Sequence, residues 1–186
     1  MHYFTFVIIG RDADPEPAVA RALEPFDEDL EVEPYHDYLD AGDIQRMAEH
    51  YGIPPTDLAG LARKMRDWRG GEGGVDARGL YAITTYNPDG KFDWYEIGGG
   101  WDGYIPGSRH NVISARALHR SPRLRKCLPY YLVTPDGRWL ETASGWRFGP
   151  PKTKADRRVE RRWLAQVRRV LKQYIDRKVV CVDIHS

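Results

Sequence analysis

Runs of apolar residues near the two ends of the chain predict two buried strands. His2 to Ile9 is rich in aromatic and β-branched residues, and Val179 to Ile184 repeats that character close to the last residue. Runs of this length and composition are typical of strands inside a sheet. We therefore expect both segments to contribute to the core.

Two further pairs of β-rich runs are each separated by a Pro-Asp-Gly sequence. The first pair is 80–86 with 91–97, and the second is 130–134 with 138–142. Proline and glycine adopt the backbone angles that a chain reversal needs, so turn residues between β-rich runs indicate hairpins. The sequence therefore predicts two hairpins.

Apolar residues at helical spacing predict three helices, over 43–52, 56–70 and 154–177. In each segment the apolar side chains recur every three or four residues and share one face. The first two segments end at glycines, which commonly stop helices, and Thr56 is placed to cap the second. The third segment is the longest predicted element of the chain.

The order of these elements predicts an α+β fold. It resembles a split βαβ (ferredoxin-like) plan, in which an antiparallel sheet has inserted hairpins and helices packed on one face. In this plan the two terminal strands are antiparallel neighbours. We expect a single domain over 1–186, with an irregular acidic excursion at 11–42 and an irregular basic insert at 106–129.

Composition indicates a folded protein without a membrane partner. Hydrophobic residues make up 41% of the chain, and no apolar run approaches the roughly 20 residues of a membrane span. The first residues lack the features of a signal peptide, and Cys127 and Cys181 lie far apart, so we expect a cytoplasmic protein without a disulfide or zinc site. No hydrolase or kinase motif occurs, and we expect no cofactor.

The segment from Tyr86 to Tyr104, YNPDGKFDWYEIGGGWDGY, is the strongest candidate site. Its glycines permit close approach of backbone N–H groups to a ligand, its aromatic rings can stack on a planar group, and nearby arginines can contact a phosphate. Aromatic residues on strands are also often core residues. The predicted ligand-binding residues are Trp94, Tyr95, Gly98, Gly99, Trp101, Tyr104 and Arg109.

A second candidate site depends on pairing of the terminal strands. That pairing would bring Asp183 and His185, which share one face of the last strand, close to His2. Two imidazoles and a carboxylate can bind a divalent metal or form a base with its orienting partner. Such residues at the edge of a sheet can equally be solvated surface residues.

The charge distribution suggests a third site. Residues 1–50 contain 3 basic and 13 acidic side chains, whereas residues 147–178 contain 12 basic and 3 acidic ones. The two segments can pack together or face different partners. On the last predicted helix Arg158, Arg161, Arg162 and Arg169 lie largely off the apolar stripe, where they can follow a phosphate backbone or simply contact water.

Several motifs together resemble a family of uncharacterised proteins from tailed phages and prophages. They are HYFTFVIIG, PFDEDLEVEPY, TTYNPDGKFDWYEIGGGW, YLVTPDGRWLETASGW and VVCVDIHS, in this order over nearly the whole chain. This chain has Gly100 where the family usually has arginine, and Phe92 where it usually has tryptophan. The resemblance implies a small accessory protein that binds a host protein, a nucleic acid or a nucleotide, and no activity of the family is implied.

These observations leave three hypotheses for the function. The leading one is a non-catalytic accessory protein that binds a nucleotide-like small ligand or a host partner through the loop at 86–104. The second is a small metal-assisted or acid–base enzyme that uses His2, Asp183 and His185. The third is binding of nucleic acid through the basic helix at 154–177.

Overall fold

The computed structural model of the chain describes residues 1–142 and 153–186, which form two compact units. The larger unit comprises 1–30 and 89–186, and the smaller one comprises 31–88. Each unit has its own buried apolar core. Chain length alone could not reveal this division.

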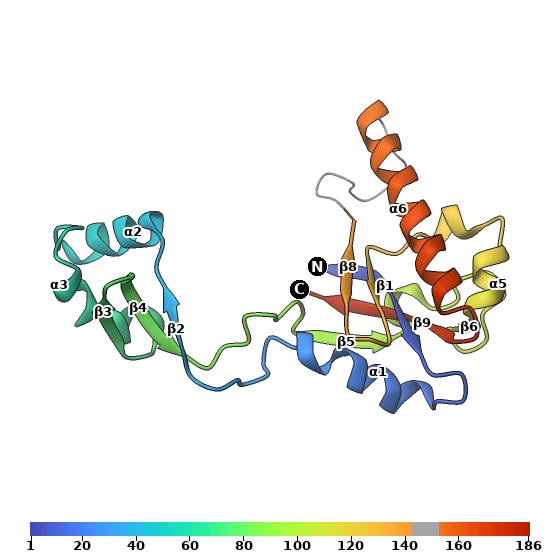
Figure 1. The fold of residues 1–186 in the computed structure, drawn as a ribbon, viewed down its shortest axis with the longest axis horizontal. Helices are drawn as coiled ribbons and strands as arrows, with labels where there is room; N and C mark the ends of the chain where they lie inside the picture. Colours follow the sequence, from blue (N-terminus) through green and yellow to red (C-terminus); the bar gives the residue numbers. More distant parts are fainter. Residues whose placement is uncertain (143–152) are drawn as a thin grey trace. The chain divides into compact units, whose positions relative to one another are not determined.

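The larger unit is built on a mixed sheet of six strands (Figure 1). Along the main path the strands follow the order β5-β9-β1-β7-β8, and β6 also pairs with β9. The strands are β1 (His2–Ile9), β5 (Trp94–Ile97), β6 (Val112–Ser114), β7 (Tyr131–Val133), β8 (Trp139–Glu141) and β9 (Lys178–His185). The helices are α1 (Pro15–Leu23), α5 (Ala115–Arg120) and α6 (Lys154–Gln173), with short 3-10 turns η1 (Glu24–Phe26), η2 (Gly99–Trp101) and η3 (Leu124–Cys127).

The two terminal strands pair as the sequence predicts. β1 and β9 are antiparallel over eight residue pairs, from His2 with His185 to Ile9 with Lys178. On its other side β1 pairs in parallel with β7, so the sheet is mixed and the prediction of an antiparallel sheet is wrong. β7 and β8 form the predicted second hairpin.

Helices cover both faces of this sheet. Phe4, Phe6 and Cys181 point into a cluster that includes Trp163 of α6, whereas Val7 and Val180 point into a second cluster with residues of α1. Side chains alternate along a strand, and here both sets are apolar and buried. The prediction that helices pack on one face is wrong, and the ferredoxin-like arrangement is not confirmed.

Two segments expected to be irregular contain regular elements. The acidic excursion at 11–42 includes α1, because Pro15 and Pro17 lie in its first turn, where a missing N–H is tolerated. The basic insert at 106–129 includes β6 and α5, and the Ser114 hydroxyl caps α5 by accepting the N–H of Ala117.

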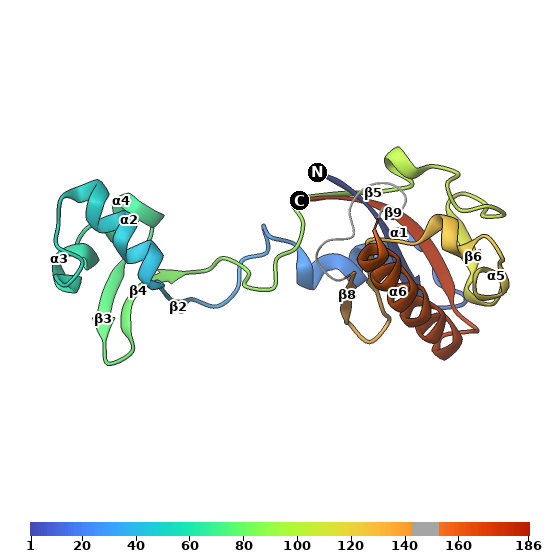
Figure 2. The same cartoon turned by 90° about the horizontal axis from the view of Figure 1, so that it is seen from above.

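The smaller unit is a three-stranded antiparallel sheet with helices on one face (Figure 2). Its strands are ordered β2 (Tyr35–Tyr38), β4 (Gly79–Thr84), β3 (Gly73–Asp76), and its helices are α2 (Ala41–Tyr51), α3 (Leu58–Ala62) and α4 (Met65–Arg69). Their core contains Met47, Leu61, Met65 and Leu80. α2 confirms the first predicted helix, with Gly52 in the left-handed conformation at its end.

Two predictions for local structure are wrong. The expected hairpin of 80–86 with 91–97 does not form, because β4 pairs with β2 and β3 in the smaller unit while β5 pairs with β9 in the larger one. The expected helix over 56–70 is divided into α3 and α4, and Asp57 rather than Thr56 caps α3 by accepting the N–H of Gly60. Part of the basic segment, 147–152, lies outside the described residues.

We expect both cysteine thiols to be unreactive in the folded protein. Burial raises the pKa of Cys127 to about 11 and that of Cys181 to about 12, so almost no thiolate exists near neutral pH. Labelling with a thiol reagent at pH 8 should therefore be at least about 100-fold slower in native than in urea-unfolded protein. Rapid labelling of the native protein would contradict the burial of these side chains.

Candidate functional site

The register of β1 and β9 brings together the predicted histidine site. His2 lies opposite His185, and Asp183 lies opposite Phe4, so these side chains share the face of the sheet that α6 covers further along. β5 extends the same edge, with Trp94 paired to His185. The prediction that the end of the last strand lies beside the start of the first is confirmed.

Asp183 is a buried carboxylate that holds His2. Its Oδ2 lies 3.1 Å from the Nδ1 of His2 and accepts the N–H of Gly100 at 2.9 Å. The Asp183 side chain is 2% exposed, whereas the His2 side chain is 59% exposed. Oδ1 of Asp183 is buried and has no hydrogen-bond partner within the described residues. A buried polar atom without a partner is costly for stability and is often associated with function.

Asp93 forms a second pair with the other histidine. The Nδ1 of His185 lies 2.7 and 3.0 Å from the two carboxylate oxygens of Asp93, and the N–H of Asp93 donates to the carbonyl oxygen of His185. The hydrogen bond from His185 lowers the pKa of the Asp93 carboxyl. This edge of the sheet therefore carries two aspartate–histidine pairs.

The two imidazole rings contact each other and an exposed tryptophan. The His2 and His185 ring centroids are 5.3 Å apart in an edge arrangement, and the ring of Trp94 lies 5.9 Å from that of His2. Each Nδ1 faces a carboxylate, so Nε2 is the ring nitrogen through which each histidine can contact a ligand. Imidazoles oriented in this way can accept or donate protons.

Close packing against Asp183 and Asn111 explains why glycines occupy positions 98 and 99 of the loop. A Cβ atom at Gly99, where φ is +49°, would lie 2.6 Å from the Cβ of Asp183, and one at Gly98 would lie 2.3 Å from the side-chain nitrogen of Asn111. The N–H of Gly98 donates to the carbonyl oxygen of Cys181, and that of Gly103 donates to Asn111. These N–H groups already donate hydrogen bonds within the protein, so they are not available to a ligand.

The predicted aromatic residues are divided between the two faces of the sheet. Trp101 and Tyr104 pack against Phe4 on the face of His2, with ring centroids 5.5 and 4.9 Å from that of Phe4. Tyr95 lies on the opposite face, beside Phe92. Trp94 and Tyr104 are 45% and 44% exposed, which leaves them accessible, whereas the Nε1 of Trp101 is buried without a partner within the described residues.

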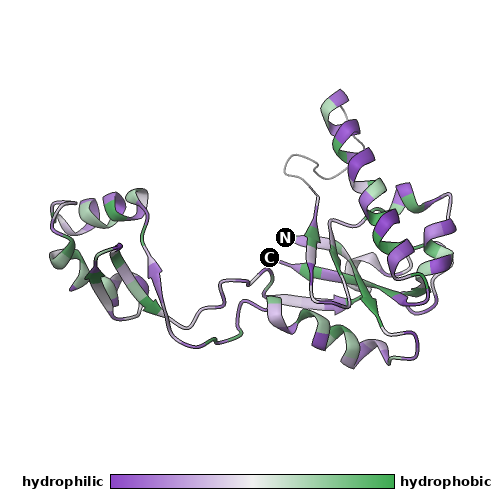
Figure 3. Ribbon diagram, in the orientation of Figure 1, coloured by the Kyte–Doolittle hydropathy of each residue, from purple (hydrophilic) through white to green (hydrophobic). Residues whose placement is uncertain are grey.

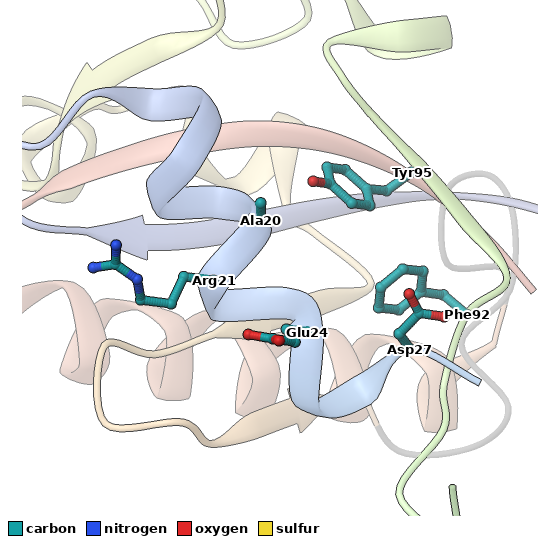
Figure 4. A pocket seen from close by; sticks show the side chains of 6 residues that line it. All are labelled: Ala20, Arg21, Glu24, Asp27, Phe92 and Tyr95. Atoms are coloured by element: carbon teal, nitrogen blue, oxygen red, sulfur yellow. The ribbon is translucent and has the colours of Figure 1, made fainter. Parts of the chain in front are cut away.

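Tyr95 borders a separate hollow of about 390 Å³ between β5 and α1 (Figure 4). Ala20, Arg21, Glu24, Asp27 and Phe92 form the rest of its lining. Burial and, to a smaller degree, the charge of Asp27 raise the pKa of the Tyr95 hydroxyl. This hollow lies on the face away from the histidines, so the two sites are separate.

The predicted arginines also lie apart from the histidine pairs. Arg109 is exposed, and its backbone forms an isolated bridge with Val112. Arg158, Arg161, Arg162 and Arg169 are exposed along α6. The structure therefore places one candidate surface on this helix and another at the edge formed by β1, β5 and β9.

Sequence reasoning missed Asp93 as a member of the site. Its pairing with His185 follows from the β5–β9 register, and the sequence instead suggested a hairpin partner for β5. Among the described residues, no group of three or more His, Cys, Asp or Glu side chains is placed to hold a metal ion. The geometry therefore favours oriented imidazoles over the predicted His2, Asp183 and His185 metal site.

Comparisons with protein-family models, curated proteins and solved structures found no match to this chain. None of the described helices has both the length and the apolar character required to cross a membrane.

Replacing Gly99 with alanine should destabilise the fold through contact with Asp183. Gly103 is a matched control, because it also has positive φ, +68°, but no neighbouring atom of the described residues lies within 4 Å of its Cβ position. We expect Gly103→Ala to lower the free energy of unfolding by about 1 kcal/mol from backbone strain. Gly99→Ala should cost roughly 1–3 kcal/mol more, since a crowded Cβ is added to that strain. Equal losses in urea unfolding would contradict the packing described here.

Acid should weaken the pairing of Asp93 with His185. The folded-state pKa of Asp93 is depressed, so its stabilisation is present above the unfolded-state pKa and is lost as pH falls through the folded value. We expect His185→Gln to raise the pKa of Asp93, measured by carbon-13 NMR of the carboxyl group, and to flatten the fall in stability below about pH 4. An unchanged Asp93 pKa would argue against this pair.

Proposed function

We propose that the two histidines form an acid–base site that acts on a nucleotide ligand with a phosphodiester bond. The observation that carries the proposal is the pair of oriented imidazoles, 5.3 Å apart, each held through Nδ1 by its own carboxylate. A histidine held in this way presents an unprotonated Nε2 as a base, or a protonated one as an acid. When two such groups lie side by side, one can remove a proton and the other can donate a proton in the same reaction.

RNA is the substrate class that needs only these two groups for cleavage. One histidine removes the proton from the ribose 2′-hydroxyl, and that oxygen attacks the adjacent phosphorus. The bond between phosphorus and the 5′-oxygen breaks, and the second histidine protonates the departing oxygen, which leaves a 2′,3′-cyclic phosphate. Exposed Trp94, whose ring lies beside that of His2, offers a surface on which a base can stack.

The carboxylates have different roles in this proposal. Asp183 is buried, and its Oδ2 holds the largely exposed His2 through Nδ1. Asp93 lies at the surface and orients His185. The glycine loop supports the site indirectly, because Gly100 donates its N–H to Asp183. In this view the glycines position a carboxylate and do not bind phosphate themselves.

Non-catalytic binding of a nucleotide or a host protein is the second candidate, in line with the phage or prophage resemblance of the motifs. The exposure of Trp94 and Tyr104 favours it, since both rings can contact a ligand without any proton transfer. The two candidates differ in whether the ligand changes chemically. Trp94→Ala should weaken ligand binding whichever candidate function is correct. If the protein only binds its ligand, the His2 and His185 variants should preserve that binding.

The catalytic proposal predicts cleavage of the dinucleotide uridylyl-adenosine, with a bell-shaped dependence of the rate on pH. His2→Gln and His185→Gln should each lower the rate about 100-fold or more. His119→Gln, on α5 and outside the site, is the matched control and should retain the rate. Product can be measured by chromatography of the cyclic phosphate, and the 2′-deoxy dinucleotide should remain intact.

Two results would contradict the catalytic proposal. The first is absence of cleavage by purified protein, and the second is cleavage that both histidine variants retain. Binding of the dinucleotide without cleavage, lost on Trp94→Ala, would instead favour the non-catalytic candidate. Fluorescence of the protein's tryptophans during titration provides that measurement.

A further inference from the structure

The outer face of α6 has seven basic side chains and no acidic one. All seven are exposed, and the hydrophilic positions recur as purple bands along this helix in Figure 3. They are Arg157, Arg158, Arg161, Arg162, Arg168, Arg169 and Lys172. Helix faces exposed to water normally carry both positive and negative side chains. A helix face with only positive side chains therefore needs an explanation.

The acidic residues of α6 do not balance this charge. Glu160 is 5% exposed and lies on the buried side, where its carboxylate accepts two hydrogen bonds from Arg125 at 3.0 and 2.7 Å. Asp156 forms the capping box with Thr153 at the start of the helix. Glu160 is the only acid between Arg157 and Lys172. The seven cations therefore have no carboxylate among them.

The seven cations form two rows along the helix. With about 100° per residue they fall within an arc of about 140°, opposite the buried Trp163 and Val167. One row contains Arg157, Arg161, Arg168 and Lys172, and the other contains Arg158, Arg162 and Arg169. The rows are separated by about 90°, and the small Ala165 lies between them. Together they extend for about 22 Å.

This arrangement is unfavourable for the isolated helix. Cations four residues apart repel each other, as Arg157 does Arg161 and Arg168 does Lys172. Arg157 and Arg158 also lie near the positive end of the helix dipole. A polyanion placed along this face would remove both effects. Six of the seven residues are arginines, and the planar guanidinium group of arginine can donate two hydrogen bonds to the oxygens of one phosphate.

We propose that α6 binds double-stranded DNA, with its two rows of cations contacting the two phosphate strands that border a groove. The major groove is about 12 Å wide and admits an α-helix. Contacts to phosphate carry no sequence information, so binding is independent of sequence. This surface is separate from the histidine site and does not depend on the reaction proposed for it.

Binding of a fluorescein-labelled 20-base-pair duplex by the full-length protein, followed by fluorescence anisotropy across a series of NaCl concentrations, tests the proposal. Seven phosphate contacts would give a slope of log affinity against log salt of about −6. The variant with Arg161, Arg162 and Arg169 all changed to Glu should reduce the magnitude of this slope by about 3 and weaken binding at least about 100-fold.

A matched variant controls for net charge. Arg11, Arg63 and Arg123 are exposed and lie outside α6, so changing all three to Glu alters net charge equally. This control should bind within about threefold of the unaltered protein. Circular dichroism should show that both variants fold, since new Glu–Arg pairs on α6 favour the helix.

Three outcomes would overturn the proposal: no binding of duplex at 50 mM NaCl, equal losses in the two triple variants, or tighter binding of a single-stranded RNA of the same length. His2→Gln and His185→Gln should leave duplex binding unchanged. The duplex lacks 2′-hydroxyls, so its binding can succeed or fail independently of dinucleotide cleavage.

Discussion

Antiparallel pairing of β1 with β9 is the interaction on which the larger unit depends. The eight pairs from His2 with His185 to Ile9 with Lys178 place two apolar strands at the centre of the sheet. Both faces of these strands are buried, one under α5 and α6 and the other under α1. Because β7 pairs with β1 and both β5 and β6 pair with β9, every other strand but β8 attaches directly to this pair. A shift in its register by one residue would exchange the two buried faces.

The same pairing determines the geometry of the candidate site. It places the two imidazoles opposite each other, and it sets Asp183 beside His2 at a point where the apolar core ends. The glycine loop then closes over Asp183, where a larger side chain at Gly99 would collide with it. The geometry of the candidate site therefore depends on the packing of the core. The two rows of cations on α6 depend only on the exposure of the outer face of that helix.

The sequence predicts strongly patterned elements well. The apolar runs of β1 and β9, the β7–β8 hairpin and the helical stripe of α6 all follow from local periodicity, and the antiparallel terminal pair is confirmed. Local periodicity favours a hairpin of β4 with β5, and no local signal shows that β4 instead pairs on both sides with β2 and β3 in the smaller unit.

The candidate site was predicted only in part, for a similar reason. His2, Asp183 and His185 could be inferred from the terminal pairing, but Asp93 depends on the long-range β5–β9 register. The glycines suggested an open ligand loop, whereas their function in packing becomes clear only when Asp183 is placed beneath them. Aromatic residues adjacent in sequence, such as Trp94 and Tyr95, necessarily point to opposite faces of their strand.

The central claim is that both imidazoles contact the same phosphate group of the ligand. A crystal structure of the protein with the unreactive 2′-deoxy form of the dinucleotide tests this most directly. The account predicts that phosphate oxygens, or the ribose oxygens bonded to the same phosphorus, lie within about 2.6–3.2 Å of the Nε2 atoms of both His2 and His185. A dinucleotide bound elsewhere, or histidines too far apart to reach one phosphate, would contradict it.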